Sequence, residues 1–286
     1  MEKAIAKAGV LLEALPYLRQ FAGETFVIKF GGSIQNMPGG EASFVEDVLF
    51  LHTAGIHPVI IHGGGREISA AQKKRGIESR FVHGLRVTDA VTMRLTAEVL
   101  GRINLRIAGR LRKMGAAAAG FSGFRGGIVK ARKLRLTGKP AGEDLGFVGE
   151  VGGFFSEPLR LARQERRILV LSSVGVGARG ELYNVNADDV AGALAGRLRA
   201  AKLVLMTDVS GIKGRSGKLL STITGRQAKA LIRQGVISRG MIPKVKSCLN
   251  ALSRGVGKAH IIDGRLKHSL LLEIFTARGV GTQIIH

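Results

Sequence analysis

The sequence has few of the residues that build disulfide frameworks, zinc clusters or base-stacking surfaces. Its 286 residues include one cysteine, no tryptophan and two tyrosines. Cys248 alone can form neither an internal disulfide nor a cysteine-based zinc site, which is typical of proteins from a reducing compartment. We therefore expect a cytoplasmic protein without a structural zinc site.

Long apolar runs are also missing, since none approaches the roughly 20 residues that a membrane-spanning helix needs. The first twenty residues carry Glu2, Lys7 and Glu13 among spaced apolar residues, so they lack the continuous apolar core of a secretory signal. The spacing predicts an amphipathic helix instead. Pro16 is expected to kink that helix or to end it early. No membrane partner is expected.

Acidic residues are scarce: 21 Asp and Glu stand against 44 Lys and Arg, a formal net charge of +23. Such an excess suggests anionic partners, nucleic acid first among them. The basic residues are spread along the chain, however, and few aromatic side chains are present for base stacking. We therefore favour a solvated basic surface over nucleic-acid binding. The densest basic run, VKARKLRL at 129–136, is expected to be a charged edge strand.

Strand-like and helix-like segments alternate along the chain. Strands are predicted at 25–30, 58–62, 168–174, 202–209 and 258–263, with a charged hairpin at 127–151. Helices are predicted near 41–54, 66–75, 89–114, 187–200, 224–235, 243–255 and 266–278. Buried strands that alternate with amphipathic helices predict an α/β fold, in which helices cover both faces of a mostly parallel sheet.

Two glycine-rich turns follow the first two predicted strands. One is KFGGS from Lys29 to Ser33, and the other is HGGGR from His62 to Arg66. In a parallel α/β sheet, ligands bind beyond the carboxyl ends of the strands. Glycines there let backbone N–H groups approach an anion, and helix N-termini add partial positive charge. We interpret the turns as two sides of an anion site, although Lys29 precedes its glycines, unlike the lysine of a P-loop.

Polar side chains follow other predicted strands. Arg86 precedes a helix, where its guanidinium is suited to bind a carboxylate through two hydrogen bonds. Asn184, Asn186 and Asp188 alternate in YNVNADD, so an extended segment would place all three on one face. TDVSGI at 207–212 begins a loop positioned to close over a nucleotide. These residues indicate an ordered polar site.

The order and spacing of the motifs resemble those of the acetylglutamate kinases, within the amino acid kinase family. The matching segments, which extend over nearly the whole chain, include KFGG, HGGGR, GLRVTD, YNVNADDVAGALA, KLVLMTDVSGI, GMIPKV and HIIDGR. The resemblance implies a three-layer αβα sandwich. It implies three parts: residues 1–22, a helix that links subunits; residues 23–195, a lobe for the amino-acid substrate and dimer formation; and residues 196–286, a lobe for ATP.

The reaction implied by the resemblance transfers the γ-phosphoryl group of ATP to the side-chain carboxylate of N-acetyl-L-glutamate, the second step of arginine synthesis. Mg²⁺ would bridge the phosphates. A carboxylate is already ionised at neutral pH, so no general base is required. The barrier is repulsion between two anions, which positioned cations and backbone donors reduce.

Roles for individual residues follow from their places in the matching motifs. Lys29 and Lys244 would flank the phosphoryl group, and Asp188 would orient both ammonium groups. Phosphate binding is implied for Gly31, Gly32, Gly63 and Gly64. Substrate binding is implied for Gly64, Gly65, Arg86, Asn184 and Asn186. Nucleotide binding is implied for Thr207, Asp208, Val209, Ser210, Gly211, Met241 and Lys244.

Regulation is implied by the N-terminal helix. Family members with such a helix resemble ring-shaped hexamers, built as trimers of dimers and inhibited by arginine. We therefore expect a homo-oligomer and inhibition by arginine. The residues at positions resembling the arginine pocket are Tyr17, Lys202, His260, Glu273 and Gly279.

Three positions depart from the family pattern. Arg66 stands where proline is usual, SGFRGG at 122–127 replaces an SGKDG-like stretch, and Arg239 replaces a glycine. Two alternatives stay open. One is a kinase for a related acidic substrate, such as aminoadipate on a small acidic carrier protein, which a basic surface would suit. The other is a nucleic-acid-binding protein on an inactive kinase fold.

Overall fold

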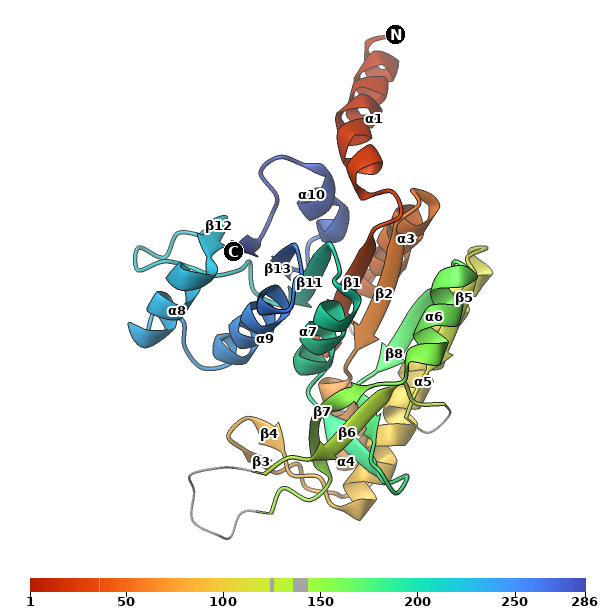
Figure 1. Cartoon of the computed structure of the whole chain (residues 1–286), viewed down its shortest axis with the longest axis vertical. Helices are drawn as coiled ribbons and strands as arrows, with labels where there is room; N and C mark the ends of the chain where they lie inside the picture. Colours follow the sequence, from red (N-terminus) through yellow and green to blue (C-terminus); the bar gives the residue numbers. More distant parts are fainter. Residues whose placement is uncertain (36, 124–125, 136–143) are drawn as a thin grey trace.

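An eight-stranded sheet forms the centre of the computed structural model, which describes residues 1–35, 37–123, 126–135 and 144–286 (Figure 1). From one edge to the other, the strands are β12 (Thr222–Thr224), β14 (Thr282–Ile285), β13 (Lys258–Asp263), β11 (Lys202–Thr207), β1 (Thr25–Phe30), β2 (His57–His62), β8 (Ile168–Ser172) and β5 (Ala118–Phe121). Neighbouring strands run parallel except for β13 and β14. The mostly parallel sheet is as predicted.

Helices cover both faces of the sheet and enclose two apolar cores. One core contains residues of α1 (Glu2–Phe21), α2 (Gly32–Gln35), α3 (Gly40–Thr53), α4 (Gly65–Lys74), α5 (Ala90–Lys113) and α10 (Ser269–Phe275). The other contains residues of α6 (Ser156–Gln164), α7 (Ala187–Leu198), α8 (Gly225–Arg233) and α9 (Met241–Ser253). The predicted three-layer αβα sandwich is confirmed.

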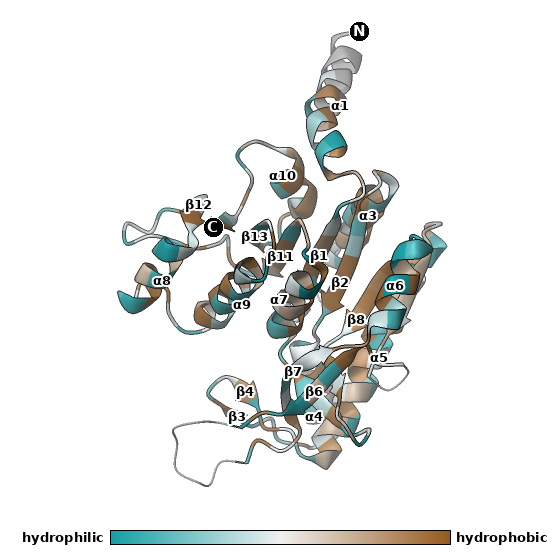
Figure 2. Ribbon diagram, viewed as in Figure 1, coloured by the Kyte–Doolittle hydropathy of each residue, from teal (hydrophilic) through white to brown (hydrophobic). Residues whose placement is uncertain are grey.

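Strand β1 shows how the sequence produces these layers. All six of its residues are buried, because β2 and β11 flank it and helices lie above and below. Phe26, Ile28 and Phe30 pack into one core, and Val27 packs into the other. Alternation along the strand places Lys29 on the same face as Val27, toward α7. The apolar residues of the central strands are visible in Figure 2.

A small closed barrel packs beside the sheet. It contains β10 (Leu182–Val185), β7 (Val148–Phe154), β6 (Val129–Lys133) and β9 (Val174–Val176). The antiparallel pairing of β6 with β7 confirms the predicted hairpin. The predicted charged edge strand is wrong, because β6 also pairs with β9 and a closed barrel has no edge. The alternating basic side chains are simply the exposed face of β6, and Leu136 lies outside the described residues.

Several predicted boundaries need correction. Helix α1 does not end early at Pro16 but continues to Phe21. Aromatic contacts of Tyr17 with Phe275 and of Phe21 with Phe26 hold its last turn against the body, so packing offsets the backbone hydrogen bond that proline lacks. The strand predicted at 168–174 divides into β8 and β9, and the last helix is shorter than predicted.

The two halves of the sheet come from different parts of the chain. Strands from Lys202 onward fill one half, and earlier strands fill the other, so β11 and β1 meet at the middle.

Helix α1 projects away from the body, and its Leu12 and Leu15 side chains are exposed (Figure 1). None of the helices in the described parts of the chain is long and apolar enough to cross a membrane.

Candidate functional site

The three predicted catalytic residues meet near the carboxyl end of β1. Lys29 leaves β1 toward the first turn of α7, where its Nζ lies 2.9 Å from Oδ1 of Asp188. Lys244, in the first turn of α9, places its Nζ 2.7 Å from the other oxygen, Oδ2. One carboxylate thus holds two ammonium groups, and the cluster keeps a net positive charge.

Asp188 stays ionised in this cluster. Burial would raise the pKa of its carboxyl group, but the charges and hydrogen bonds of Lys29 and Lys244 outweigh burial and hold the pKa at about 2. The carboxylate therefore forms ion pairs with both lysines and is not a proton donor or base at neutral pH. Its role in the geometry is to keep two cations side by side.

The segment that carries Asp188 is not extended throughout, as the alternation of polar residues suggested. Strand β10 ends at Val185, and α7 begins at Ala187. Asn186 caps the helix, because its Oδ1 accepts a hydrogen bond of 2.8 Å from the backbone N–H of Asp188. Asn184, Asn186 and Asp188 still line one cavity, because the helix turns Asp188 back toward the strand end.

The two glycine-rich turns are tied together beside this cluster. The N–H of Gly63 donates to the backbone oxygen of Phe30 at 3.4 Å. Gln35 of α2 reinforces that contact, because its Nε2 donates to the same oxygen at 3.3 Å and to the oxygen of Gly63 at 3.1 Å. Sequence reasoning missed Gln35, because nothing in the pattern indicated that α2 folds back over both turns.

A buried histidine fixes the end of β2. His62 is fully buried, which lowers its pKa to about 4 and keeps the ring neutral. Asn104 of α5 lies 3.1 Å from His62 Nε2 and donates to the backbone oxygens of Phe121 and Val170. The asparagine therefore joins the ends of β2 and β5 to the middle of β8, next to the second glycine-rich turn.

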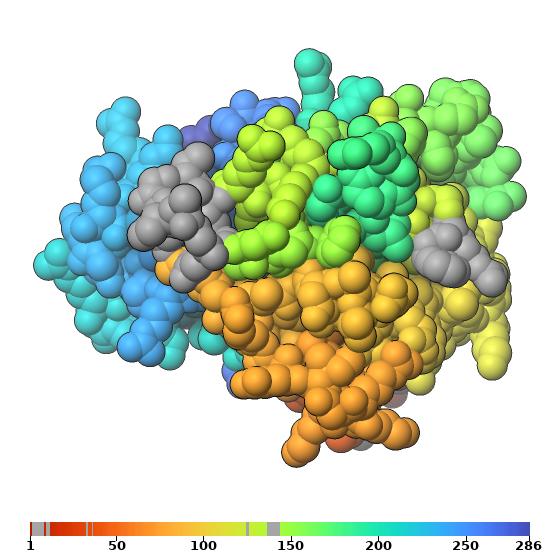
Figure 3. Space-filling view, turned by 90° about the horizontal axis from the view of Figure 1, so that it is seen from below, coloured from red at the N-terminus to blue at the C-terminus, as the bar shows by residue number. Residues whose placement is uncertain are grey.

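A cavity of about 270 Å³ opens beside the lysine and carboxylate cluster. Every residue predicted to bind the substrate lines it: Gly64, Gly65, Arg86, Asn184 and Asn186. Gly32 and Gly63 line it too, but Gly31 does not. The hairpin of β3 (Phe81–Val82) and β4 (Leu85–Arg86), which the sequence did not reveal, forms another wall. Figure 3 views this side of the molecule, with α4 and the hairpin in orange against the green barrel strands.

Arg86 is held firmly at the wall of this cavity. Its Nη1 donates to Gln72 and Ser79, and its Nη2 donates to Gly65 and Ser69. The guanidinium also lies 4.6 Å from the centroid of the Phe81 ring. The protein therefore uses the terminal donors of Arg86, and a bound carboxylate would have to replace some of these contacts or meet the remaining Nε.

A second cavity, of about 360 Å³, lies beyond the end of β11. Among the predicted nucleotide-binding residues, those lining it are Asp208, Val209, Ser210, Gly211 and Met241. Thr207 and Lys244 do not line it; Thr207 is buried beneath, and Lys244 faces Asp188. Lys213, which begins the loop expected to close over a nucleotide, lines it too, whereas sequence reasoning missed Val236, Ile237, Ser238 and Arg265 on its wall. These residues come from loops whose approach depends on the tertiary fold.

A third cavity, of about 370 Å³, contains all five residues of the expected arginine pocket: Tyr17, Lys202, His260, Glu273 and Gly279. His260 Nδ1 lies 2.7 Å from Glu273 Oε1, and Lys202 Nζ lies 3.2 Å from His260 Nε2. The other oxygen of Glu273 accepts the N–H groups of Val280 and Gly281. The Glu273 carboxylate therefore fixes the conformation of the loop around the cavity and also contributes to the charge of the cavity.

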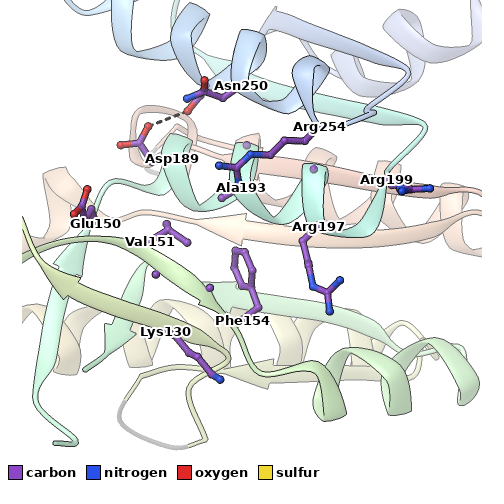
Figure 4. A pocket seen from close by; sticks show the side chains of 15 residues that line it. Lys130, Glu150, Val151, Phe154, Asp189, Ala193, Arg197, Arg199, Asn250 and Arg254 are labelled. Carbon is purple, nitrogen blue, oxygen red and sulfur yellow. Dashed lines mark hydrogen bonds between the residues drawn. The ribbon is translucent and has the colours of Figure 1, made fainter. Parts of the chain in front are cut away.

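A larger cavity than these three, of about 900 Å³, was not anticipated from the sequence. It is a groove between α7 and α9 on one side and β6 and β7 on the other, with Phe154 at its floor and Arg197 and Arg254 beside it (Figure 4). Asp189 faces this groove and accepts a hydrogen bond of 3.0 Å from Ser247. The first turn of α7 thus separates the groove from the cluster around Asp188.

Two departures from the family pattern give no evidence of a lost function. Arg239 adopts a left-handed backbone conformation with φ of 45°, which glycine adopts more readily. Its side chain is exposed, and Lys244 nonetheless reaches Asp188. In SGFRGG, residues 124–125 lie outside the described part of the chain.

The side chains available as ligands determine how a metal ion could bind at this site. Within the described residues, no three His, Cys, Asp or Glu side chains gather where they could hold an ion. Both oxygens of Asp188 are engaged by lysines. A Mg²⁺ ion that arrives with a nucleotide, held mainly by phosphate oxygens and water, fits such a site.

Known proteins resemble the chain along its whole length. Residues 24–263 match the model of the amino acid kinase family. The acetylglutamate kinase of Geobacter sulfurreducens is 48% identical, over 99% of both chains. The N-acetylglutamate synthase of Neisseria gonorrhoeae, solved with coenzyme A and N-acetyl-glutamate, is 26% identical with a TM-score of 0.87 over 98% of this chain and 63% of that one. The same enzyme with coenzyme A and L-arginine is 28% identical with a TM-score of 0.79, over 97% and 65%. These matches and the fold show that the chain belongs to the amino acid kinase family.

Proposed function

We propose that this protein transfers the γ-phosphoryl group of ATP to the side-chain carboxylate of N-acetyl-L-glutamate, a step of arginine biosynthesis. The observation that carries the proposal is the cluster of Lys29, Asp188 and Lys244, which borders on two glycine-rich turns and the adjoining cavity. The 48% identity to an acetylglutamate kinase over the full chain supports the substrate.

The cluster suits a reaction between two anions. The acceptor is already ionised, so the site needs no base, and the geometry offers none, because Asp188 is neutralised by two lysines. Lys29 and Lys244 would stabilise the negative charge on the phosphoryl oxygens, while N–H groups of Gly32 and Gly64 would donate to them. Bound Mg²⁺ would supply further charge neutralisation on the nucleotide phosphates.

The two halves of the sheet would divide the substrates between them. We place the acceptor in the 270 Å³ cavity of residues 23–195, and the nucleotide in the 360 Å³ cavity of residues 196–286. Asn186 suits the acceptor, because capping occupies its oxygen and leaves its amide N–H groups to donate. Asn184 and Arg86 would complete the contacts, the latter through its Nε or after exchange of a protein partner.

An ADP-release assay tests the proposal. The purified protein should release ADP from Mg-ATP when N-acetyl-L-glutamate is added, and carrier-linked aminoadipate should be a much poorer acceptor. Activity on N-acetyl-L-glutamate no greater than background would overturn the proposed substrate. An inactive protein that binds RNA tightly at physiological salt would instead favour the nucleic-acid alternative.

Regulation by arginine is a further part of the proposal. The five expected residues share one cavity, and the synthase that resembles this chain was solved with L-arginine. Helix α1 supplies Tyr17 to the cavity and projects from the body with exposed leucines, which suits a contact between subunits. We expect a homo-oligomer, built as a hexamer of three dimers, in the cytoplasm. Mass measurement by light scattering tests the oligomer.

A further inference from the structure

Arg66 connects the two cavities assigned to the substrates. It is the second residue of α4, directly after the second glycine-rich turn, where neighbouring Gly65 lines the 270 Å³ cavity. Its Nη2 lies 3.6 Å from Oδ2 of Asp208, which follows β11 and lines the 360 Å³ cavity. The ion pair therefore joins the wall of one cavity to the wall of the other.

The path of this ion pair follows from the strand order. Strand β1 lies between β2 and β11 in the sheet. Arg66 belongs to the segment after β2, and Asp208 belongs to the segment after β11. A contact between these two segments spans the end of β1, which leads into the turn that holds Gly31 and Gly32. The ion pair therefore crosses beside the predicted phosphate cradle.

The Arg66 contact with Asp208 is easily exchanged. The side chains are 61% and 47% exposed, and ion pairs this exposed contribute little to stability. A phosphate group offers a guanidinium two strong parallel hydrogen bonds. The single contact of 3.6 Å between Arg66 and Asp208 does not provide them. Asp208 also interacts electrostatically with Arg265, so it keeps a cationic neighbour when Arg66 leaves.

We propose that Arg66 is an additional phosphate-binding residue, which leaves Asp208 and binds the terminal phosphate of the nucleotide once both substrates are in place. The proposal rests on the proposed function, because it requires a triphosphate to span the two cavities. Arg66 would add a third cation to Lys29 and Lys244, on the solvent side of the transferring group. ADP lacks the γ-phosphate and would not engage Arg66.

Calorimetry with two nucleotides tests this role without turnover. A non-hydrolysable ATP analogue and ADP, each with Mg²⁺, would be titrated into the wild type, Arg66→Gln and Arg66→Lys, all in the presence of saturating N-acetyl-L-glutamate. We expect Arg66→Gln to weaken binding of the triphosphate about 10- to 100-fold, while ADP affinity stays unchanged. The affinity of Arg66→Lys for the triphosphate should lie between those of the wild type and Arg66→Gln, because lysine keeps the charge but loses the paired donors of the guanidinium.

Arg75→Gln is the matched control. Arg75 directly follows α4 and forms an exposed ion pair of 2.9 Å with Glu98, away from both cavities. The Arg75→Gln substitution removes the same charge as Arg66→Gln, so a purely long-range electrostatic effect on nucleotide binding would appear in both variants. Equal weakening of ADP and the triphosphate by Arg66→Gln, or no weakening of either, would overturn the inference. Wild-type turnover on N-acetyl-L-glutamate, measured separately, decides the proposed function itself.

Discussion

Lys29 and Lys244 hold opposite oxygens of one carboxylate, at 2.9 Å and 2.7 Å, although one comes from the first strand and the other from the last long helix. Two ammonium groups would repel each other at this separation without Asp188 between them. Because α7 and α9 pack closely, with Gly192 against the backbone of Ser247, the carboxylate and Lys244 keep their relative positions. The site is therefore preorganised before any phosphate binds.

Removal of either lysine should reduce turnover far more than it reduces stability. We expect Lys29→Ala and Lys244→Ala each to lose about 100- to 1,000-fold in kcat, the cost of removing one preorganised charge stabiliser. Asp188 keeps one lysine partner in each variant, so the fold should persist by circular dichroism. Lys73→Ala, at an exposed position of α4, is the control and should retain full kcat. Near-normal turnover in Lys29→Ala would contradict the assignment.

The sequence was informative where a residue's role depends on its own strand or turn. The buried run before Lys29 predicted β1, and the glycines after it predicted a close approach of backbone to ligand. Alternation with Asn184 and Asn186 indicated that Asp188 belongs to a polar site, but its role, like that of Lys244, was identified through the family resemblance. Their meeting at one carboxylate depends on packing of α7 against α9, which local periodicity does not encode.

Features that depend on distant contacts escaped prediction. Nothing in the spacing of Gln35 indicates that its amide joins two glycine-rich turns. The barrel was missed because its strands are short and its closure depends on pairing between segments far apart in sequence. The basic run in β6 was predicted as an edge strand because its pairing with β9 cannot be read from the local sequence. Arg86 was predicted to bind a carboxylate through two hydrogen bonds, whereas the fold already surrounds its terminal nitrogens with protein acceptors.

Two adjacent glycines in the second turn should differ in their tolerance of a side chain. A Cβ on Gly64 would lie 2.6 Å from Ile103 Cδ1 and 2.8 Å from Leu100 Cδ2, both buried in the core. A Cβ on Gly65 would meet nothing within 4 Å. We expect Gly64→Ala to lower the free energy of unfolding by about 1–3 kcal/mol, and Gly65→Ala to leave it within about 0.5 kcal/mol. Urea unfolding measures both; equal stabilities would show that the core absorbs the methyl group.

A buried acid gives a pH dependence of stability. Asp47 of α3 is 1% exposed and lies 2.6 Å from His268 Nδ1, just before α10. Burial raises its pKa from 3.8 to about 6, against the lowering effect of His268. The folded protein therefore binds this proton more tightly than the unfolded chain, so the contribution of Asp47 to stability falls as pH rises from about 4 through 6.

Asp47→Asn should remove that dependence. Relative to the wild type, its free energy of unfolding should rise between pH 4 and pH 7 by up to about 3 kcal/mol, the equivalent of the pKa shift. Thermal unfolding of both proteins across this range measures the difference. Glu46→Gln is the control: Glu46 is exposed, lies 4.0 Å from the same histidine and is the smallest of the causes that shift the pKa of Asp47, so this variant should keep most of the dependence. Parallel curves for Asp47→Asn and the wild type would contradict the prediction.

Inhibition by arginine should weaken as Lys202 loses its proton. Burial lowers the pKa of Lys202 to about 8, helped by the positive charge of Lys258 and opposed by Glu273. We expect its ammonium group to pair with the carboxylate of arginine, so the half-inhibitory concentration should rise between about pH 7 and pH 9, as the charge is lost through pH 8. Lys258→Met removes the neighbouring charge, raises the pKa of Lys202 and should move the loss of inhibition to higher pH. A half-inhibitory concentration independent of pH in both proteins would exclude Lys202 as the carboxylate partner.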